Sequence, residues 1–300
     1  MKYEVKDSKY NTVKDVLIKE FKFSKRLITK LKKENRIFVN DNPCFVNYAL
    51  KNNDVVQIDF NFIEECDNIF PTKMNLDIIY EDDYLLVLDK PAKIETHPTC
   101  LKYENTLSNG IKYYYDSINL KRKIRPVSRL DKETSGVIVF AKNQYVQEEL
   151  IKQMKSNIFK KEYIAIVEGV LKENKGEIIG NIARKENSIL ERCISDEGVY
   201  AKTNYEVLKT IESENLKATV VKLRLETGRT HQIRVHMKYI GHPLIGDFLY
   251  GQKSDLIERQ ALHSWKVEFI HPILKEKMYF EARVPRDMER LIKNEGEFYL

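Results

Sequence analysis

Residues 125–143 read RPVSRLDKETSGVIVFAKN, a charged loop with small residues that runs into the apolar stretch 137–140. The apolar stretch predicts a buried strand, and the Thr-Ser-Gly before it predicts a turn. If residues 127–131 are extended, Arg129 and Asp131 point to the same face, because side chains alternate along a strand. An arginine that close would keep the Asp131 carboxylate ionised. On charge alone, the favoured interpretation is an ordinary strand-end ion pair, which is frequent and weak.

Further strands are expected on both sides of this run. Apolar or alternating stretches predict them at residues 84–88, 163–167, 205–208 and 218–225. An apolar stripe over 146–154, with Asn143 as its N-cap, predicts one helix, and Thr230 and Gly241 are placed to begin and end another. Many strands with few intervening helices favour an α+β fold whose central sheet is mixed, largely antiparallel and flanked by helices.

The first 60 residues have a different pattern. Apolar stripes predict helices over 12–21 and 27–31, the second capped by Ser24, and strands follow at 37–39 and 55–60. Residues 61–73 lack periodicity and contain Pro71. A chain of 300 residues is long enough for about two domains. We therefore predict a small α/β domain at 1–62, a linker at 63–73 and a second domain at 74–300.

Composition limits the classes of function. The chain has 51 basic and 45 acidic residues, a net charge of +6, and no apolar stretch typical of a signal peptide or membrane span. Cys44, Cys66, Cys100 and Cys193 lie far apart and predict free thiols in a reducing cytosol, so we expect a cytoplasmic protein. No glycine-rich phosphate loop and no zinc-type His spacing occurs, which argues against a nucleotide cofactor or a metal.

Positive charge is concentrated in two places. Residues 22–36 carry seven basic side chains and one acid, Glu34, so their net charge equals that of the entire chain. Such a run is either a solvated helix face or a surface that contacts phosphates. A second group precedes Asp131 and Tyr163. The residues that we predict to bind RNA, if the second interpretation holds, are Lys25, Arg26, Lys30, Lys33, Arg36, Lys121, Arg122, Lys123, Arg125 and Lys161.

Two resemblances favour the RNA interpretation. Residues 36–40 (RIFVN) and 51–56 (KNNDVV), after the predicted helix pair, resemble the ribosomal-protein S-four type RNA-binding domain. The run RLDKETSGVIVFAKN resembles the catalytic loop of the RluA/RluD family of RNA pseudouridine synthases. Further segments resemble that family in the same order: 81–92 (EDDYLLVLDKPA) with 97–98 (HP), 161–169 (KEYIAIVEG), 227–236 (TGRTHQIRVH), 241–247 (GHPLIGD), 261–265 (ALHSW) and 269–272 (FIHP).

The second resemblance implies an isomerase that converts uridine in RNA into its carbon-linked isomer without a cofactor. It implies that Asp131 is the catalytic carboxylate, which would attack the anomeric carbon, attack the base ring or assist elimination to a glycal. It implies that Tyr163 contacts the uracil and could accept a proton, that Arg234 pairs with Asp131, and that Arg129 helps to displace the target nucleotide. A uridine in folded RNA must be flipped out of its stack to reach such a site.

The sequence leaves alternatives for the RNA target and for the class of function. Ser128 and Lys93 depart from the family's usual His and Gly, which puts the RNA target in doubt more than the activity. We expect a monomer that acts on structured RNA, with large-subunit (23S) ribosomal RNA ahead of transfer RNA. The alternative is a non-catalytic RNA-binding or ribosome assembly factor. An aspartate-dependent glycosidase would need a second carboxylate, and the motifs offer none in that role.

Overall fold

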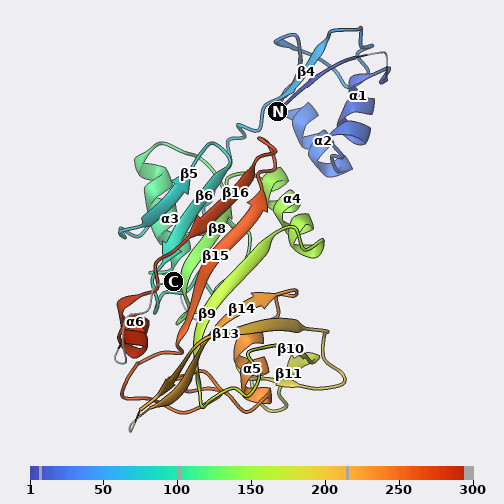
Figure 1. The fold of residues 1–300 in the computed structure, drawn as a ribbon. Coiled ribbons are helices and arrows are strands. Elements are labelled where there is room, and N and C mark those ends of the chain that lie inside the picture. Colours follow the sequence, from blue (N-terminus) through green and yellow to red (C-terminus); the bar gives the residue numbers. More distant parts are fainter. Residues whose placement is uncertain (7–8, 100–102, 214–215, 294–300) are drawn as a thin grey trace.

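The computed structural model describes residues 1–6, 9–99, 103–213 and 216–293 (Figure 1). Cys100, predicted as a free thiol, lies outside these ranges, whereas Cys44, Cys66 and Cys193 are free thiols. A small four-stranded sheet with its helices forms what we call the N-terminal unit, residues 1–58, and a ten-stranded sheet forms the centre of the remaining chain. No helix in the described ranges is long and apolar enough to cross a bilayer.

The N-terminal unit has the helices and strands that the sequence predicts. Ser24 accepts a hydrogen bond from the Leu27 amide (3.3 Å) and caps the second helix, and the side chains of Thr12 and Asp15 form a capping box at the first. The strand order is β1-β4-β2-β3, antiparallel throughout. The elements are β1 (Lys2–Glu4), α1 (Val13–Asp15) continued by the π-helical η1 (Val16–Glu20), α2 (Lys25–Lys33), β2 (Ile37–Val39), β3 (Asn42–Pro43) and β4 (Val55–Ile58).

The central sheet is mixed and largely antiparallel, as predicted. Its order is β10-β13-β14-β9-β15-β8-β6-β5, with β16 beside β15 and β7 beside β8. In the described part of the chain, the pairing of β15 with β8 is parallel and the other pairings are antiparallel. The strands are β5 (Asp77–Glu81), β6 (Leu85–Lys90), β7 (Arg125–Pro126), β8 (Ser135–Ala141), β9 (Lys160–Glu168), β10 (Lys175–Ile179), β13 (Lys202–Glu212), β14 (Lys217–Leu225), β15 (Leu262–Ile270) and β16 (Lys277–Glu281).

Helices and one separate hairpin flank this sheet, which completes the α+β fold. They are α3 (Leu107–Ser117), α4 (Gln144–Lys155), α5 (Gln232–Tyr239), α6 (Arg286–Lys293) and the hairpin of β11 (Ile182–Arg184) with β12 (Arg192–Ile194). Asn143 caps α4 through the Val146 amide (2.9 Å), as predicted. The prediction that Thr230 caps α5 is wrong. His231 holds that position in a left-handed conformation (φ 58°), so the helix begins at Gln232.

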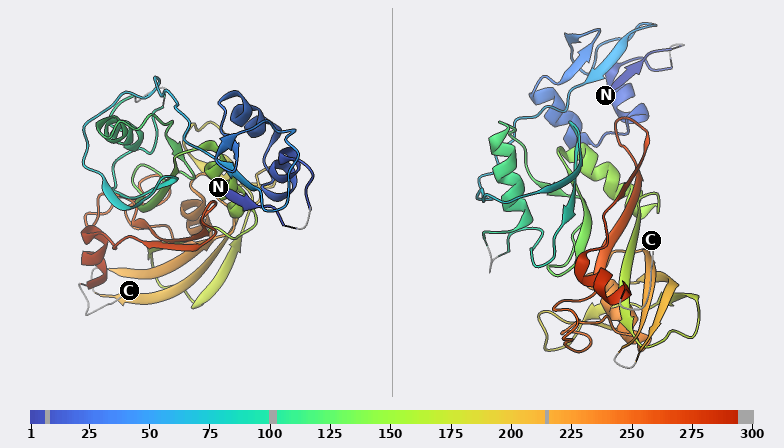
Figure 2. Two further views of the ribbon diagram at one scale, coloured as in Figure 1. Left: turned by 90° about the horizontal axis from the view of Figure 1, so that it is seen from above. Right: turned by 60° about the vertical axis from the view of Figure 1, so that its left-hand side comes forward.

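The N-terminal unit packs on α4 at one end of an elongated molecule, and α5 lies towards the other end (Figures 1 and 2). The Phe60 ring stacks on the Tyr145 ring with centroids 5.0 Å apart, and Phe23 meets the same ring edge-on at 4.9 Å. Residues 59–76 contain no helix or strand, and the predicted linker at 63–73 lies within this stretch. The two parts of the chain therefore share an apolar contact despite their separate sheets.

Candidate active site

Asp131 lies in the loop between β7 and β8, and its side chain is 29% exposed. The carbonyl groups on both sides of it are held by buried polar side chains. The Thr96 hydroxyl donates to the Leu130 carbonyl (3.0 Å), and the Lys90 ammonium donates to the Lys132 carbonyl (3.1 Å). Lys90 also bonds the carbonyls of residues 91 and 94, and burial lowers its pKa to about 7. The loop is thus fixed from its backbone, which leaves the Asp131 carboxylate partly open to solvent.

Arg234 of α5 is the arginine that pairs with Asp131, as the sequence resemblance implied. Its Nη1 lies 3.4 Å from Asp131 Oδ2. The rest of the guanidinium binds Asp247, with Nε 2.6 Å from Oδ2 and Nη2 2.7 Å from Oδ1. Asp247 is fully buried and also accepts the amides of Leu249 and Tyr250. Because this fork-to-fork contact fixes the guanidinium plane, it also sets where Nη1 meets Asp131.

His231 and Tyr250 complete a network around the carboxylate. His231 Nε2 lies 3.9 Å from Asp131 Oδ2, and its Nδ1 is 2.8 Å from the Tyr250 hydroxyl. The Tyr250 hydroxyl accepts the Arg192 amide (2.8 Å), and its ring lies 4.8 Å from the Arg234 guanidinium carbon. Burial lowers the pKa of His231, although the Asp131 charge opposes this shift. The ring beside Asp131 is therefore a neutral imidazole at pH 7.

Tyr163 is buried on β9, directly opposite Ser264 of β15. Burial and, secondly, the charge of Asp131 raise the pKa of the Tyr163 phenol. The phenol is therefore protonated at neutral pH. Lys161 lies two residues earlier, so its side chain leaves the strand on the same face as Tyr163. Burial lowers the pKa of Lys161 to about 8.

The expectation that Arg129 lies against Asp131 is wrong. The strand before the loop ends at Pro126, and the backbone bends at residues 127–128, so the alternation that would place both side chains on one face is lost. Arg129 is exposed and has no ion-pair partner among the described residues. It lies near His97, whose pKa is lowered by burial and, to a smaller extent, by the Arg129 charge. Arg234 occupies the position beside Asp131 that the sequence pattern suggested for Arg129.

Of the ten predicted RNA-binding residues, five contact residues 59–65, four are exposed, and Lys161 is half-buried on β9. The five contacts join Lys30 and Arg125 to Glu64, Arg36 to Asp59, Lys121 to Glu65 and Arg122 to Asn61. Glu64 is central, because both Lys30 Nζ (2.7 Å) and Arg125 Nη1 (2.8 Å) reach its carboxylate, whose side chain is only 8% exposed. The side chains of Lys121, Arg122 and Arg125 therefore contact the connection to the N-terminal unit rather than Asp131.

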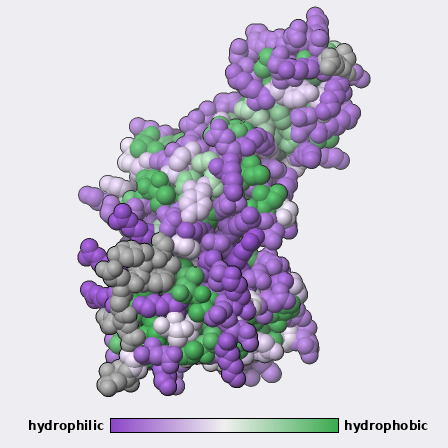
Figure 3. Space-filling model, in the orientation of Figure 1, coloured by the Kyte–Doolittle hydropathy of each residue, from purple (hydrophilic) through white to green (hydrophobic). Residues whose placement is uncertain are grey.

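Four of the predicted RNA-binding residues are exposed to solvent. Lys25, Arg26 and Lys33 are exposed on α2, and Lys123 is exposed before β7. Hydrophilic residues cover most of the visible face of the N-terminal unit (Figure 3). Lys25, Arg26 and Lys33 remain the strongest candidates for phosphate contacts in this unit.

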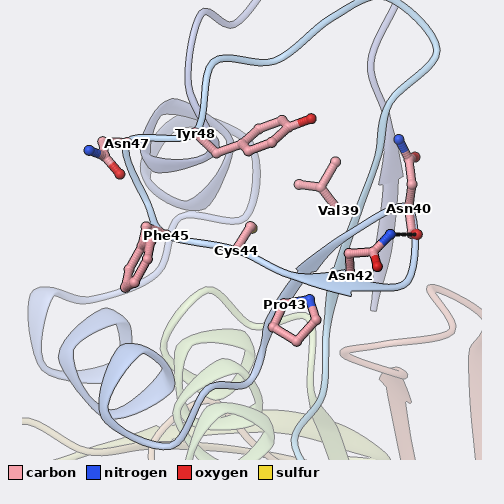
Figure 4. A pocket seen from close by; sticks show the side chains of 8 residues that line it. All are labelled: Val39, Asn40, Asn42, Pro43, Cys44, Phe45, Asn47 and Tyr48. Carbon is pink, nitrogen blue, oxygen red and sulfur yellow. Dashed lines mark hydrogen bonds between the residues drawn. The ribbon is translucent and has the colours of Figure 1, made fainter.

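Two hollows lie elsewhere on the surface. One, of about 320 Å³, lies in the N-terminal unit and is lined by Tyr48, Val39, Cys44 and Asn42, among others (Figure 4). The side-chain amide of Asn42 donates to the Asn40 carbonyl at its edge. The other, of about 470 Å³, is lined by residues of β5, β6, β15 and the start of α6. Asp131 lines neither of these hollows, and we place the candidate site at Asp131 because of its contacts with Arg234 and His231. In the described ranges, no group of three or more His, Cys, Asp or Glu is arranged to hold a metal.

The sequence did not indicate a role for His231, Asp247 or Tyr250, although the first two lie within segments that resemble the family and Tyr250 follows one of them. Their importance depends on contacts between α5 and the loop that follows it. The hydrophobic periodicity of the sequence does not indicate contacts of this kind. The only local signal was that Asp247 follows a short apolar segment that resembles a family motif.

Comparison with known proteins identifies the class of enzyme to which this fold and site belong. Residues 84–239 match the family model described as RNA pseudouridylate synthase, and the chain belongs to this family. It is accordingly an RNA pseudouridine synthase, an isomerase that acts on uridine in RNA.

Particular relatives agree with this class. The chain is 41% identical over 278 residues to the uncharacterized RNA pseudouridine synthase YhcT of Bacillus subtilis, covering 93% of this chain and 91% of that protein. It is 34% identical over 258 residues to ribosomal large subunit pseudouridine synthase D of Xanthomonas campestris, covering 81% and 76%. The human RNA pseudouridylate synthase domain containing 1 shares the fold, with a TM-score of 0.58 at 24% identity over 73% of this chain and 94% of that chain.

Proposed function

We propose that this enzyme forms pseudouridine in large-subunit ribosomal RNA and that Asp131 is its catalytic carboxylate. The observation that carries the proposal is the geometry of Asp131, an ionisable group that is fixed from its backbone and still partly exposed. The name of the Xanthomonas relative, a ribosomal large subunit enzyme, supports the choice of RNA. The match to that relative covers most of both chains.

The isomerisation breaks the bond between uracil N1 and the sugar carbon and makes a new bond from ring carbon C5 to the same sugar carbon. Overall, C5 loses one proton and N1 gains one. Both Arg234 and His231 face Oδ2 of Asp131. No hydrogen bond or ion pair from the described residues reaches Oδ1, which leaves this oxygen for the substrate. Attack on the anomeric carbon, attack on the ring and elimination to a glycal all begin from an ionised carboxylate. Arg234 Nη1 lies 3.4 Å from Oδ2 of this carboxylate.

Tyr163 acts as a neutral group in this proposal. A phenol whose pKa is raised by burial and by the adjacent carboxylate does not supply a phenolate base at pH 7. Its ring can support the uracil face, and its hydroxyl can donate a hydrogen bond or pass a proton on. The proton acceptor that the sequence suggested is thus replaced by a protonated phenol.

The target base must leave its stack, at a cost of a few kcal/mol. Arg129 is exposed in the same loop as Asp131 and is not held by an ion pair in the described residues, so its side chain can enter the space that the base leaves. The N-terminal unit binds the same RNA through Lys25, Arg26 and Lys33. Because this unit and α5 lie towards opposite ends of the molecule, an RNA that contacts both must extend along it (Figure 2).

The test is Asp131→Asn, with Asp116→Asn as a matched control because Asp116 is exposed on α3. We expect the Asp131 variant to fold and bind ribosomal RNA like the wild type but to form no pseudouridine, while the control stays active. Pseudouridine is mapped in ribosomal and transfer RNA from cells with and without the protein. Product from Asp131→Asn would refute the role of Asp131. Protein-dependent product confined to transfer RNA would refute the target, and RNA binding without product would favour an assembly factor.

A further inference from the structure

Glu64 lies where the N-terminal unit meets the rest of the chain, and it contacts one cation from each side. Lys30 Nζ, from α2 of the N-terminal unit, lies 2.7 Å from Glu64 Oε1. The Arg125 guanidinium, from β7, lies against the same carboxylate, with Nη2 2.9 Å from Oε1 and Nη1 2.8 Å from Oε2. The Glu64 carboxylate therefore bridges the two parts of the molecule.

This bridge is shielded from water. The side chain of Glu64 is 8% exposed, that of Arg125 is 11% exposed and that of Lys30 is 27% exposed. Burial alone would raise the pKa of the Glu64 carboxyl, but hydrogen bonds from Arg125 and Lys30 lower it overall, so the group is ionised. Such a bridge holds its partners in one geometry, because removing either charge leaves the other buried without compensation.

Other contacts hold the same junction. The Glu64 amide donates to the Lys121 carbonyl (3.1 Å), which ties the connection to the segment before β7. The Lys30 ammonium also lies 4.0 Å from the centre of the buried Phe62 ring. Together with the aromatic contact to α4, these interactions leave the N-terminal unit little freedom to turn on the central sheet (Figures 1 and 2).

The two cations lead to the two places where the RNA is expected to bind. Lys30 lies on α2, the helix that carries the exposed candidates for phosphate contacts. Arg125 begins β7, which pairs with β8, and Asp131 lies in the loop between these strands, six residues after Arg125. Glu64 therefore links the helix that would hold the RNA backbone to the segment that carries the catalytic carboxylate.

We propose that Glu64 is a positioning residue that determines which uridine is modified, because it fixes the distance between the RNA contacts on α2 and Asp131. The proposal rests on the proposed function, since it concerns how the same enzyme selects its target. An RNA held on α2 places in the active site only a uridine that lies at the matching distance along its surface. A reacting group misplaced by about 1 Å can lose about a hundredfold in rate, so a looser junction penalises the correct uridine and admits its neighbours.

The test compares Glu64→Gln with Glu65→Gln in the full chain. Glutamine keeps the size of the side chain and removes the charge, and Glu65 is a matched control because it is 62% exposed and pairs with Lys121 at 3.2 Å. Each protein is incubated with total RNA from cells that lack the enzyme, and pseudouridine is mapped. We expect the ratio of product at the wild-type sites to product at other uridines to fall by about tenfold or more in Glu64→Gln and to stay unchanged in the control.

Lys30→Met breaks the bridge a second time, from the other side. Methionine keeps an apolar side chain over Phe62, and the Glu64–Arg125 pair remains. Because this variant also loses a cation, only an effect that it shares with Glu64→Gln supports the bridge. An unchanged site ratio in Glu64→Gln, or an equal change in Glu65→Gln, would overturn the proposal.

The junction itself is measured without RNA. Nitroxide labels are attached at residues 33 and 290, both exposed, through a ketone-bearing amino acid that leaves the native cysteines unlabelled. We expect the distribution of distances between the labels to broaden in Glu64→Gln while circular dichroism stays unchanged. If the distribution keeps its width, Glu64 does not fix the N-terminal unit and the proposal fails. If the wild type modifies no ribosomal RNA, the proposed target fails, while the site ratio in other RNA and the label distances still decide the role of Glu64.

Discussion

The contact between Arg234 and its two carboxylates predicts a sharp difference between two similar variants. Arg234 carries one positive charge and meets Asp247, which is fully buried, and Asp131, whose side chain is 29% exposed. Asp247→Asn places an amide NH₂ group where a carboxylate oxygen accepted a guanidinium N–H. Removing one charge from a buried pair costs about 3–5 kcal/mol in free energy of unfolding. Asp131→Asn leaves the Arg234–Asp247 pair intact, so we expect it to cost less than about 1 kcal/mol.

Urea unfolding measures both values. The single tryptophan, Trp265, is buried on β15 and reports on the central sheet by fluorescence, and circular dichroism provides an independent signal. Asparagine is nearly isosteric with aspartate, so the comparison tests charge and leaves volume unchanged. We expect pseudouridine formation to be lost in both variants, since Asp247 holds Arg234 in place. Equal losses of stability in the two variants would show that Asp247 is not the residue that compensates the buried arginine.

Two further predictions follow from other parts of the molecule. Burial lowers the pKa of His263 from its ordinary 6.5 to about 4. The neutral side chain is therefore fully compatible with the fold above pH 6.5. As the pH falls from 6.5 to 4, the free energy of unfolding decreases by up to about 3 kcal/mol, because the unfolded chain binds this proton more readily. Acid unfolding should accordingly be less steep in His263→Gln, and identical pH profiles for variant and wild type would contradict the reasoning. Deletion of residues 1–62 should weaken RNA binding and flatten its salt dependence. The deletion also exposes the Tyr145 ring, so the fragment carries Tyr145→Ser to keep it soluble. Unchanged affinity of that fragment would remove the N-terminal unit from RNA binding.

Features that depend on nearby residues could be predicted from the sequence. The caps at Ser24 and Asn143 and the helices after them follow from spacing within one or two turns. The antiparallel character of the sheet followed from the succession of strands. The pairing of Arg234 with Asp131 was available only through the resemblance to a known family, because 103 residues separate the two.

Features that depend on packing between distant segments could not be predicted. The left-handed His231 has no signal in its own neighbourhood, since its conformation accompanies the contact of its ring with Tyr250. The acids at 59–65 attract Lys30, Arg36 and Arg125, and neither charge run indicates this on its own. The three-residue strands of the β11–β12 hairpin are too short for a periodic pattern, so the placement of Arg184 directly opposite Arg192 is visible only in the register.

The place of β15 in the sheet affects when the enzyme can become active during its synthesis. This strand, near the end of the chain, lies between β8, which follows Asp131, and β9, which carries Tyr163. Until it inserts, the two halves of the sheet have no shared strand, and the groups that flank the substrate have no fixed separation. The ribosome must therefore complete residue 270 before the site can form. At about 5–20 residues per second, the roughly 100 residues between β9 and the end of β15 take on the order of 5–20 s. During that interval the nascent enzyme has no assembled site with which to modify RNA.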